Sequence, residues 1–161
     1  MKKTLLILIA IIFLFSIVTS ADFVGTKKCK MCHKGDKRGN VFEKWMERKH
    51  SKAFETLKKE GKEKDPACLE CHTTAFNKGG YKIGDPDASK FEGVGCESCH
   101  GPGSDYKKMS TMKDSAKAKA AGLIMPDAKV CITCHDPKKS PTAKPFKKDE
   151  YFKKIDHMYR K

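Results

Sequence analysis

The chain has too few hydrophobic residues to build an ordinary side-chain core. Only 39% of its 161 residues are hydrophobic, and some of these fall in one apolar run at the N-terminus. No stretch shows a persuasive strand pattern of alternating apolar and polar residues, so a β-sheet fold is not indicated. Histidine is also scarce, with six residues in the whole chain, which limits any chemistry that depends on imidazole.

One short motif, in contrast, occurs four times. Each pair of cysteines is separated by two residues and followed at once by a histidine, and the four pairs contain every cysteine of the chain. The residues are Cys29, Cys32 and His33; Cys68, Cys71 and His72; Cys96, Cys99 and His100; Cys131, Cys134 and His135. This is the attachment motif of c-type haem, in which the thiols form thioethers and the histidine binds the iron. The sequence therefore predicts a tetrahaem cytochrome c with four covalently bound haem c groups.

Two other uses of such cysteine pairs fit the sequence less well. Two pairs can hold one zinc ion, so the chain could form two Cys₄ zinc ribbons, but a zinc ribbon does not need a histidine after the second cysteine. A thioredoxin-type redox pair could account for one copy of the motif but not for four. Haem attachment accounts for all four copies together.

The N-terminal segment indicates export. Lys2 and Lys3 precede an almost wholly apolar run from Leu5 to Val18, and small residues up to Ala21 offer a cleavage site. We expect residues 1–21 to be a cleaved signal peptide and the protein to be periplasmic or exported. An uncleaved membrane anchor is the alternative, although the run is shorter than the ~20 residues that a spanning helix needs.

Residues 22–161 are then expected to form a single tetrahaem domain. Their length leaves roughly 35 residues for each haem, within the range of one domain. With so few residues for each haem, the chain cannot surround four haems and also form a separate hydrophobic core of side chains. We therefore expect a mostly α fold with long irregular loops, in which the haems themselves form most of the core.

The charge is strongly basic, with 34 lysines and arginines against 20 acidic residues. Such a surplus can indicate nucleic acid binding, but export makes nucleic acid an unlikely partner for this chain. Some lysines could neutralise haem propionates, and others could form a patch that attracts a redox protein with an acidic docking surface. A surface that is merely solvated is equally compatible with the sequence.

The clearest helix pattern runs from Val41 to Glu60. Apolar residues recur there at steps of three and four, Asn40 can cap the start, and Gly61 marks the end. His50 lies on the apolar stripe of this helix. In a protein whose core is haem, a histidine in that position is expected to be a distal iron ligand.

Two shorter helices are expected further along. One spans Lys113 to Ile124, before Pro126, and the other spans Asp149 to the C-terminus. His157 lies somewhat off the apolar stripe of the last helix, so periodicity alone makes it a weaker ligand candidate than His50.

Several segments resemble the cytochrome c-554 family, a tetrahaem group typified by the electron acceptor of hydroxylamine oxidoreductase. The matching segments are His50-Ser51-Lys52-Ala53-Phe54, the second motif with Gly79-Gly80-Tyr81, Phe91 to Ser104 around the third motif, and Tyr151 to His157. The resemblance covers most of residues 27–157. It implies a mostly helical, haem-packed fold with closely stacked haem pairs, a periplasmic electron carrier, and distal ligation by His50 and His157.

The resemblance also exposes a departure from the family. In the family, most haem irons have two axial histidine ligands, and one haem iron is five-coordinate. Relatives often place a further histidine soon after the Gly-Pro-Gly-Ser turn, where this chain has Asp105 and Tyr106. The resemblance therefore does not identify the sixth ligand of at least one more haem.

The histidine count sets a limit of two bis-histidine haems within one chain, because only His50 and His157 lie outside the motifs. The other two haems need a methionine, another ligand, a histidine from a neighbouring subunit, or no sixth ligand. Met109, Met112 and Met125 are the candidates between the third and fourth motifs.

Three functions are compatible with this sequence. The favoured one is a carrier of single electrons between redox partners. The second is binding or reduction of nitric oxide, hydroxylamine or nitrite at a five-coordinate haem. The third is a subunit of a haem filament formed by self-association. An enzyme is less favoured, because no histidine remains to act as proton donor or acceptor, and we assign no catalytic residue.

Overall fold

The computed structural model describes residues 20–140 and 144–157. The expected signal peptide, residues 1–21, lies almost wholly outside the described residues. Within the described part of the chain, no helix is long and apolar enough to cross a membrane.

The fold is built from short helices joined by loops, and this confirms the predicted fold class. In the described residues the only bridge between extended segments is an isolated pair, Thr73 and Glu92. The helices are α2 (Thr26–His33), α3 (Val41–Met46), α4 (Ala53–Lys59), α5 (Pro66–His72), α6 (Cys96–His100), α7 (Met109–Met112), α8 (Ser115–Ala120), α9 (Ala128–Cys131) and α10 (Lys148–Ile155), with short 3₁₀ turns η1 (Asp36–Arg38), η2 (Lys49–Lys52) and η3 (Ala88–Phe91).

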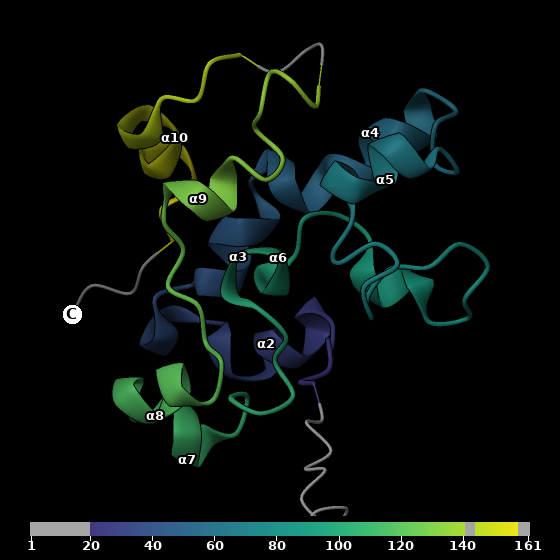
Figure 1. The fold of residues 1–161 in the computed structure, drawn as a ribbon. Helices are drawn as coiled ribbons and strands as arrows, with labels where there is room; N and C mark the ends of the chain where they lie inside the picture. The colour runs from purple at the N-terminus through teal and green to yellow at the C-terminus, as the bar shows by residue number, and fades with distance from the viewer. Residues whose placement is uncertain (1–19, 141–143, 158–161) are drawn as a thin grey trace, which may run out of the picture.

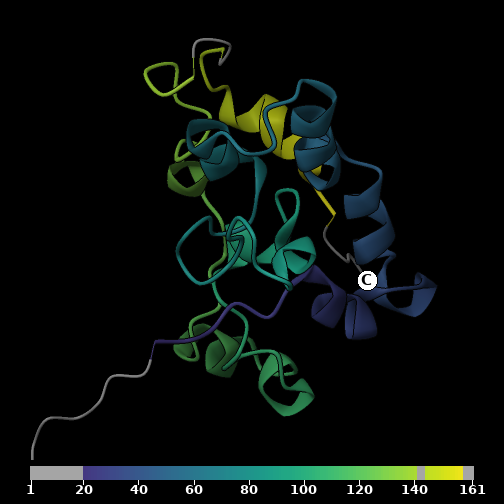
Figure 2. The same cartoon turned by 90° about the vertical axis from the view of Figure 1, so that its right-hand side faces the viewer.

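The helices are spread over the molecule rather than gathered into a bundle. In Figure 1, α3 and α6 lie near the middle, α7 and α8 at the bottom, α9 and α10 at the upper left, and α4 and α5 at the upper right. Figure 2 shows from a second side that α7 and α8 remain at the bottom and α10 near the top. Helix α2 packs against both α3 and α6, and α4 packs against α5.

The predicted helix over residues 41–60 is interrupted, and that expectation was wrong in its length. Helix α3 ends at Met46, Arg48 is extended (φ −88°, ψ 158°), and the chain resumes as η2 and α4. Ser51 Oγ lies 2.9 Å from the carbonyl oxygen of Met46 and 2.8 Å from that of Arg48, so its hydroxyl satisfies acceptors left free by the break. The break turns His50 away from the direction that a continuous helix would give it.

A loop distant in sequence holds this interruption in place. The indole Nε1 of Trp45 donates to the carbonyl of Val94 at 3.0 Å, and the backbone nitrogen of Val94 donates to the carbonyl of His50 at 2.9 Å. Gly93 has a φ of +77°, and a Cβ there would lie 2.7 Å from the carbonyl oxygen of Ser51. Only glycine fits such a close approach of two backbones.

The two later helices are shorter than the sequence indicated. The helix expected over residues 113–124 is α8, which begins after Asp114, whose side chain accepts from the backbone nitrogens of Ala116 and Lys117. It is preceded by α7, which the sequence did not predict. The last expected helix is α10, and the end of its predicted range, residues 158–161, lies outside the described residues.

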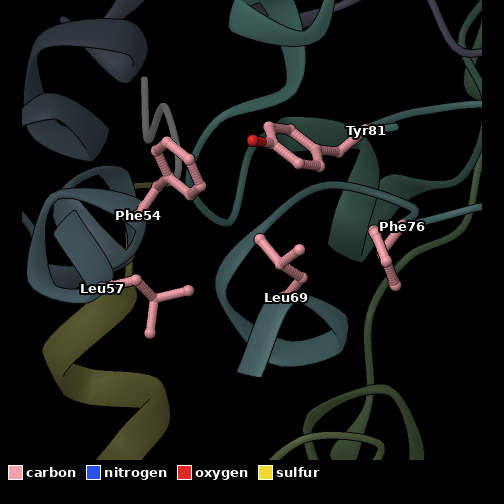
Figure 3. Packing of buried hydrophobic residues seen from close by; sticks show 5 residues of the cluster. All are labelled: Phe54, Leu57, Leu69, Phe76 and Tyr81. Carbon is pink, nitrogen blue, oxygen red and sulfur yellow. The ribbon is translucent and has the colours of Figure 1, made fainter. Parts of the chain in front are cut away.

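The side-chain core is small and lies at one end of the molecule. Phe54 and Leu57 from α4, Leu69 from α5, and Phe76 and Tyr81 from the loop after α5 point toward one another, as Figure 3 shows. The ring centroids of Phe54 and Tyr81 lie 5.2 Å apart. Elsewhere in the described part of the chain, the only buried hydrophobic residues are Tyr106 and Ala118. Among the other residues that the structure describes, including three of the four motifs, there is no such cluster.

Candidate functional site

All four Cys-x-x-Cys-His motifs adopt the same local structure, a short helix that reaches or approaches the histidine. Helices α2, α5 and α6 end at His33, His72 and His100. Helix α9 ends at Cys131 and continues as a turn, in which the backbone nitrogen of His135 donates to the carbonyl of Cys131 at 2.9 Å. Residues three and four apart share one face of a helix, so each motif presents two thiols and an imidazole on one side.

Aspartate side chains cap the N-termini of two of these helices. The side chain of Asp65 accepts from the backbone nitrogen of Ala67 at 2.9 Å, and Pro66 occupies the first helical position. Asp127 accepts from the backbone nitrogen of Lys129 at 2.8 Å and so begins α9. These caps explain why such short segments form a helical turn where the motifs need one.

Three of the six histidines have a ring nitrogen fixed by a backbone carbonyl. The Nδ1 atoms of His72, His100 and His157 lie 2.8, 2.9 and 2.8 Å from the carbonyl oxygens of Ala53, Ile124 and Ile155. A carbonyl oxygen can only accept, so Nδ1 carries the proton and Nε2 keeps its lone pair. This is the arrangement in which a histidine binds a metal through Nε2.

Burial also favours the neutral imidazole at three of the histidines. All six histidines are half-buried. Burial lowers the pKa of His33, His50 and His100. Neighbouring titratable groups lower it further at His33 and His50, whereas at His100 the hydrogen bond to the carbonyl of Ile124 opposes the shift. The neutral form is the one that can bind iron.

The structure brings the histidines together in two pairs. The ring centroids of His50 and His135 lie 6.0 Å apart, and those of His100 and His157 lie 6.3 Å apart. Metal–imidazole bonds of about 2 Å place two rings on opposite sides of one metal ion at about 6 Å between centroids. Each pair therefore has the separation that a bis-histidine iron requires.

Each pair joins one motif histidine to one histidine from outside the motifs. His50, between the first and second motifs in the sequence, lies opposite the fourth motif, and His157, after the last motif, lies opposite the third. All six histidines are within the described residues, and the two remaining ones, His33 and His72, take part in neither of the ring pairs. The first and second motifs thus have no opposing histidine.

Contacts between cysteines of different motifs show which motifs are neighbours. The side chains of Cys29 and Cys96 lie close enough for each to shift the pKa of the other, which places the first motif beside the third. Cys134 likewise raises the pKa of Cys71, which places the fourth motif beside the second. Cys99 lies close enough to Cys134 to feel its charge. The motifs therefore follow one another in space in the order first, third, fourth, second.

A cavity of about 360 Å³ lies between the first and third motifs. Cys29, Cys32 and His33 line it from one motif, and Cys96, Cys99 and His100 from the other. Met109, Met112 and Met125 also contribute to its mostly apolar wall. Met109 and Met125 are about half exposed, at 53% and 52%, so the protein chain itself does not bury these side chains.

The residues around this cavity fit haem c. Arg48 lines the cavity, and its Nε is buried without any hydrogen-bond partner among the described residues, as a donor waiting for a propionate would be. Burial raises the pKa of the Cys71 and Cys99 thiols to about 11, with Cys134 next among the causes for Cys71 and Cys131 for Cys99. These environments suit uncharged thioether sulfur better than the thiolates of a zinc site.

The eight cysteines form no disulfide. In the described part of the chain, no three or more cysteine, histidine or acidic side chains gather as ligands of a metal ion. The site is instead distributed over four separate motif helices.

Sequence reasoning missed two residues of this region. Arg48 gave no signal because it was placed within a continuous helix. Glu97, directly after the first cysteine of the third motif, is buried at 2% exposure, whereas Glu70, directly before the second cysteine of the second motif, is exposed. Both are acidic residues inside a motif, and residue type alone does not indicate which one is buried.

The chain matches known proteins in sequence and in fold. Residues 28–101 match the family described as Cytochrome c554 and c-prime. Cytochrome c-554 of Nitrosomonas europaea is 42% identical over 108 residues, which cover 57% of this chain and 43% of that protein, so the matched segment spans less than half of the curated relative. The reduced state of cytochrome c554 from Nitrosomonas europaea has a similar structure, with a TM-score of 0.66 and 29% identity over 88% of this chain and 86% of that one. Together these similarities confirm the resemblance seen in the motifs: the chain is similar to cytochrome c554 in sequence and in fold.

Proposed function

We propose that this protein is an exported tetrahaem cytochrome that carries single electrons between redox proteins. In this proposal the eight cysteines form the thioether bonds, and His33, His72, His100 and His135 are the proximal iron ligands. His50 is the distal ligand at the fourth motif and His157 the distal ligand at the third. The observation that carries the proposal is the pair of histidine separations, 6.0 and 6.3 Å, because an iron with two histidine ligands has no free position for a substrate.

The order of the motifs supports electron transfer along a row. The cysteine contacts make the third and fourth motifs the middle of the row and the first and second its ends. Haems attached in this order would each take up and release one electron and so link the two ends of the molecule. The protein's part is to hold the histidine pairs and to keep water from the iron in the middle of the row.

Binding of a small ligand is a second candidate function, and one observation favours it. The motifs without an opposing histidine, the first and the second, are both at the ends of the row. An iron there is open to a small ligand unless a methionine of the cavity wall, Met109, Met112 or Met125, occupies the sixth position at the first motif.

The surface around the first motif suits an acidic redox partner. Exposed basic side chains surround this end of the row, namely Lys27, Lys28, Lys30, Lys34, Lys37 and Arg38. A positive surface beside a terminal haem would attract an acidic protein and raise the rate of encounter. Electron exchange with such a partner is expected to slow as salt is added, whereas exchange with a small uncharged reductant is not.

Export and size can be tested on the protein as cells produce it. The mass of the intact secreted protein gives the N-terminus and the number of covalent haems at once. We expect a chain that begins after Ser20 or Ala21 and carries four haems. Fewer than four haems, or a cytoplasmic protein with an intact N-terminus, would contradict the proposal. Sedimentation at several concentrations tests the filament alternative, which a strictly monomeric protein excludes.

A further inference from the structure

A buried carboxylate lies where the first and third motifs meet. Glu97, within the third motif, is 2% exposed. Its Oε1 accepts from the backbone nitrogens of Val24 at 2.9 Å and Gly103 at 2.7 Å, and its Oε2 accepts from those of Gly25 at 2.8 Å and Val24 at 3.1 Å. Several backbone donors on one carboxylate stabilise its ionised form, which leaves a fixed negative charge inside the protein.

No cation neutralises this charge in the described residues. None of the ion pairs found there includes Glu97. Its field reaches the neighbouring groups: burial and then Glu97 raise the pKa of Tyr106, and Glu97 also opposes the lowering of the Cys29 pKa that the neighbouring Cys96 side chain causes. Cys29 belongs to the first motif, so the carboxylate of the third motif acts electrostatically on both.

The same carboxylate connects two parts of the chain that are far apart in sequence. Residues 22–25 lead into the first motif, and residues 101–104 leave the third. Besides the bonds to Glu97, the backbone nitrogen of Asp22 donates to Ser104 Oγ at 2.9 Å, and the backbone nitrogen of Ser104 donates to the carbonyl of Asp22 at 3.1 Å. Glu97 is the buried centre of this connection and fixes how the first motif lies against the third.

We propose that Glu97 is a positioning residue that holds the first and third motifs together and, through its buried charge, lowers the reduction potential of the haems attached to them. This inference rests on the proposed function. Adding an electron to iron is less favourable beside a negative charge, and the effect is strongest where water is excluded. Glu70 of the second motif is exposed, so water and salt screen its charge.

The test is a potentiometric titration of the exported holoprotein and its variants. We expect Glu97→Gln to shift the potentials of two haems upward with all four haems still attached. We expect Glu70→Gln, which removes an exposed carboxylate from inside another motif, to leave all potentials unchanged. Missing haems in the wild-type protein would contradict the proposed function itself, whereas a full complement with unchanged potentials in Glu97→Gln would overturn only the role of Glu97.

A second control separates charge from packing. A Cβ at Gly103 would lie 2.9 Å from Glu97 Oε1 and 3.1 Å from Val24 Cγ2, so Gly103→Ala disturbs the same connection and keeps the charge. We expect it to lower the melting temperature with a smaller shift in potential than Glu97→Gln gives. An equal shift would show a purely structural effect and overturn the proposal. If Glu97→Gln loses haem, the comparison is made between Glu97→Asp and Glu97→Asn, which match in size and differ in charge. Equal reduction potentials in these two variants would overturn the proposal.

Discussion

The imidazole rings of His50 and His135 lie with their centroids 6.0 Å apart, although they come from opposite halves of the chain. His50 lies between the first and second motifs in the sequence, yet it faces the fourth. His157 and His100 form a second pair at 6.3 Å, with the two rings nearly perpendicular. Each histidine from outside the motifs therefore faces a motif that lies elsewhere in the sequence, and neither pair can form before these distant segments meet.

Replacing His50 tests the first of these pairs. In His50→Ala we expect one haem per chain to change from low spin to high spin, because its sixth ligand is removed while both thioether bonds stay. The measurement is the ferric electron paramagnetic resonance spectrum together with the haem count. Lys49→Ala, a change to the exposed neighbour on the same 3₁₀ turn, is the matched control and should leave the spectrum as it was. An unchanged spectrum in His50→Ala would mean that His50 is not a ligand.

Replacing His157 tests whether the two pairs serve different irons. His157→Ala should also convert one haem, and the double variant with His50→Ala should convert two, since the two sites share no residue. The spectra of the single variants should add to give that of the double variant. If the double variant converted only one haem, both histidines would belong to the same site.

Carbon monoxide should bind only at the ends of the row. The reduced wild-type protein is expected to bind it at no more than two haems per chain, because only the first and second motifs have no opposing histidine. His50→Ala should add one binding site. Replacing Met109 and Met112 together should add a site only if one of them caps the first haem. Binding at three haems of the wild-type protein would contradict one of the two histidine assignments, and binding at four would contradict both.

Arg48 is expected to hold a haem propionate. Its Nε is buried without a partner in the described residues. Removing a hydrogen bond to a charged group costs about 1.5–3 kcal/mol, so Arg48→Gln should lower the stability of the holoprotein by that order. It should also lower one reduction potential, because a positive charge beside the iron is lost. Arg48→Lys keeps the charge and should preserve the potential better. Equal stability and potentials in Arg48→Gln and the wild-type protein would refute this contact.

The small core should respond like any well-packed core. Leu69 is fully buried at 0% exposure and lies inside the second motif. Leu69→Ala should lower the free energy of unfolding by about 2–5 kcal/mol. Ile83→Ala, at a side chain that is 43% exposed, is the comparison and should change it by no more than about 0.5 kcal/mol. A loss below 1 kcal/mol in Leu69→Ala would show that the haems rather than this cluster set the stability of that end.

The sequence predicted the motif chemistry because that information is local. Five residues define each haem attachment site, and the thiols and imidazole share a helical face whatever the rest of the fold does. The interruption between α3 and η2 could not be predicted in the same way. It depends on Trp45 and His50 bonding to Val94, and the apolar spacing of residues 41–60 continues through the break as if the helix did.

The partners of His50 and His157 were also beyond sequence reasoning. Their candidacy as ligands came from the histidine count and from the resemblance to a known family, but the motif that each one faces depends on how the loops bring distant segments together. Glu97 and Glu70 show the same limit. Both lie between the two cysteines of a motif, but at different positions, and only the folded chain shows that one is buried and the other exposed.

The most direct test of the account is a quantitative ferric electron paramagnetic resonance spectrum of the exported protein, with the spins counted per chain. We predict two low-spin irons with two histidine ligands each, belonging to the third and fourth motifs, and two irons with a different signature. Three or more bis-histidine irons in a monomeric chain, or none, would contradict the pairing of His50 with His135 and of His157 with His100.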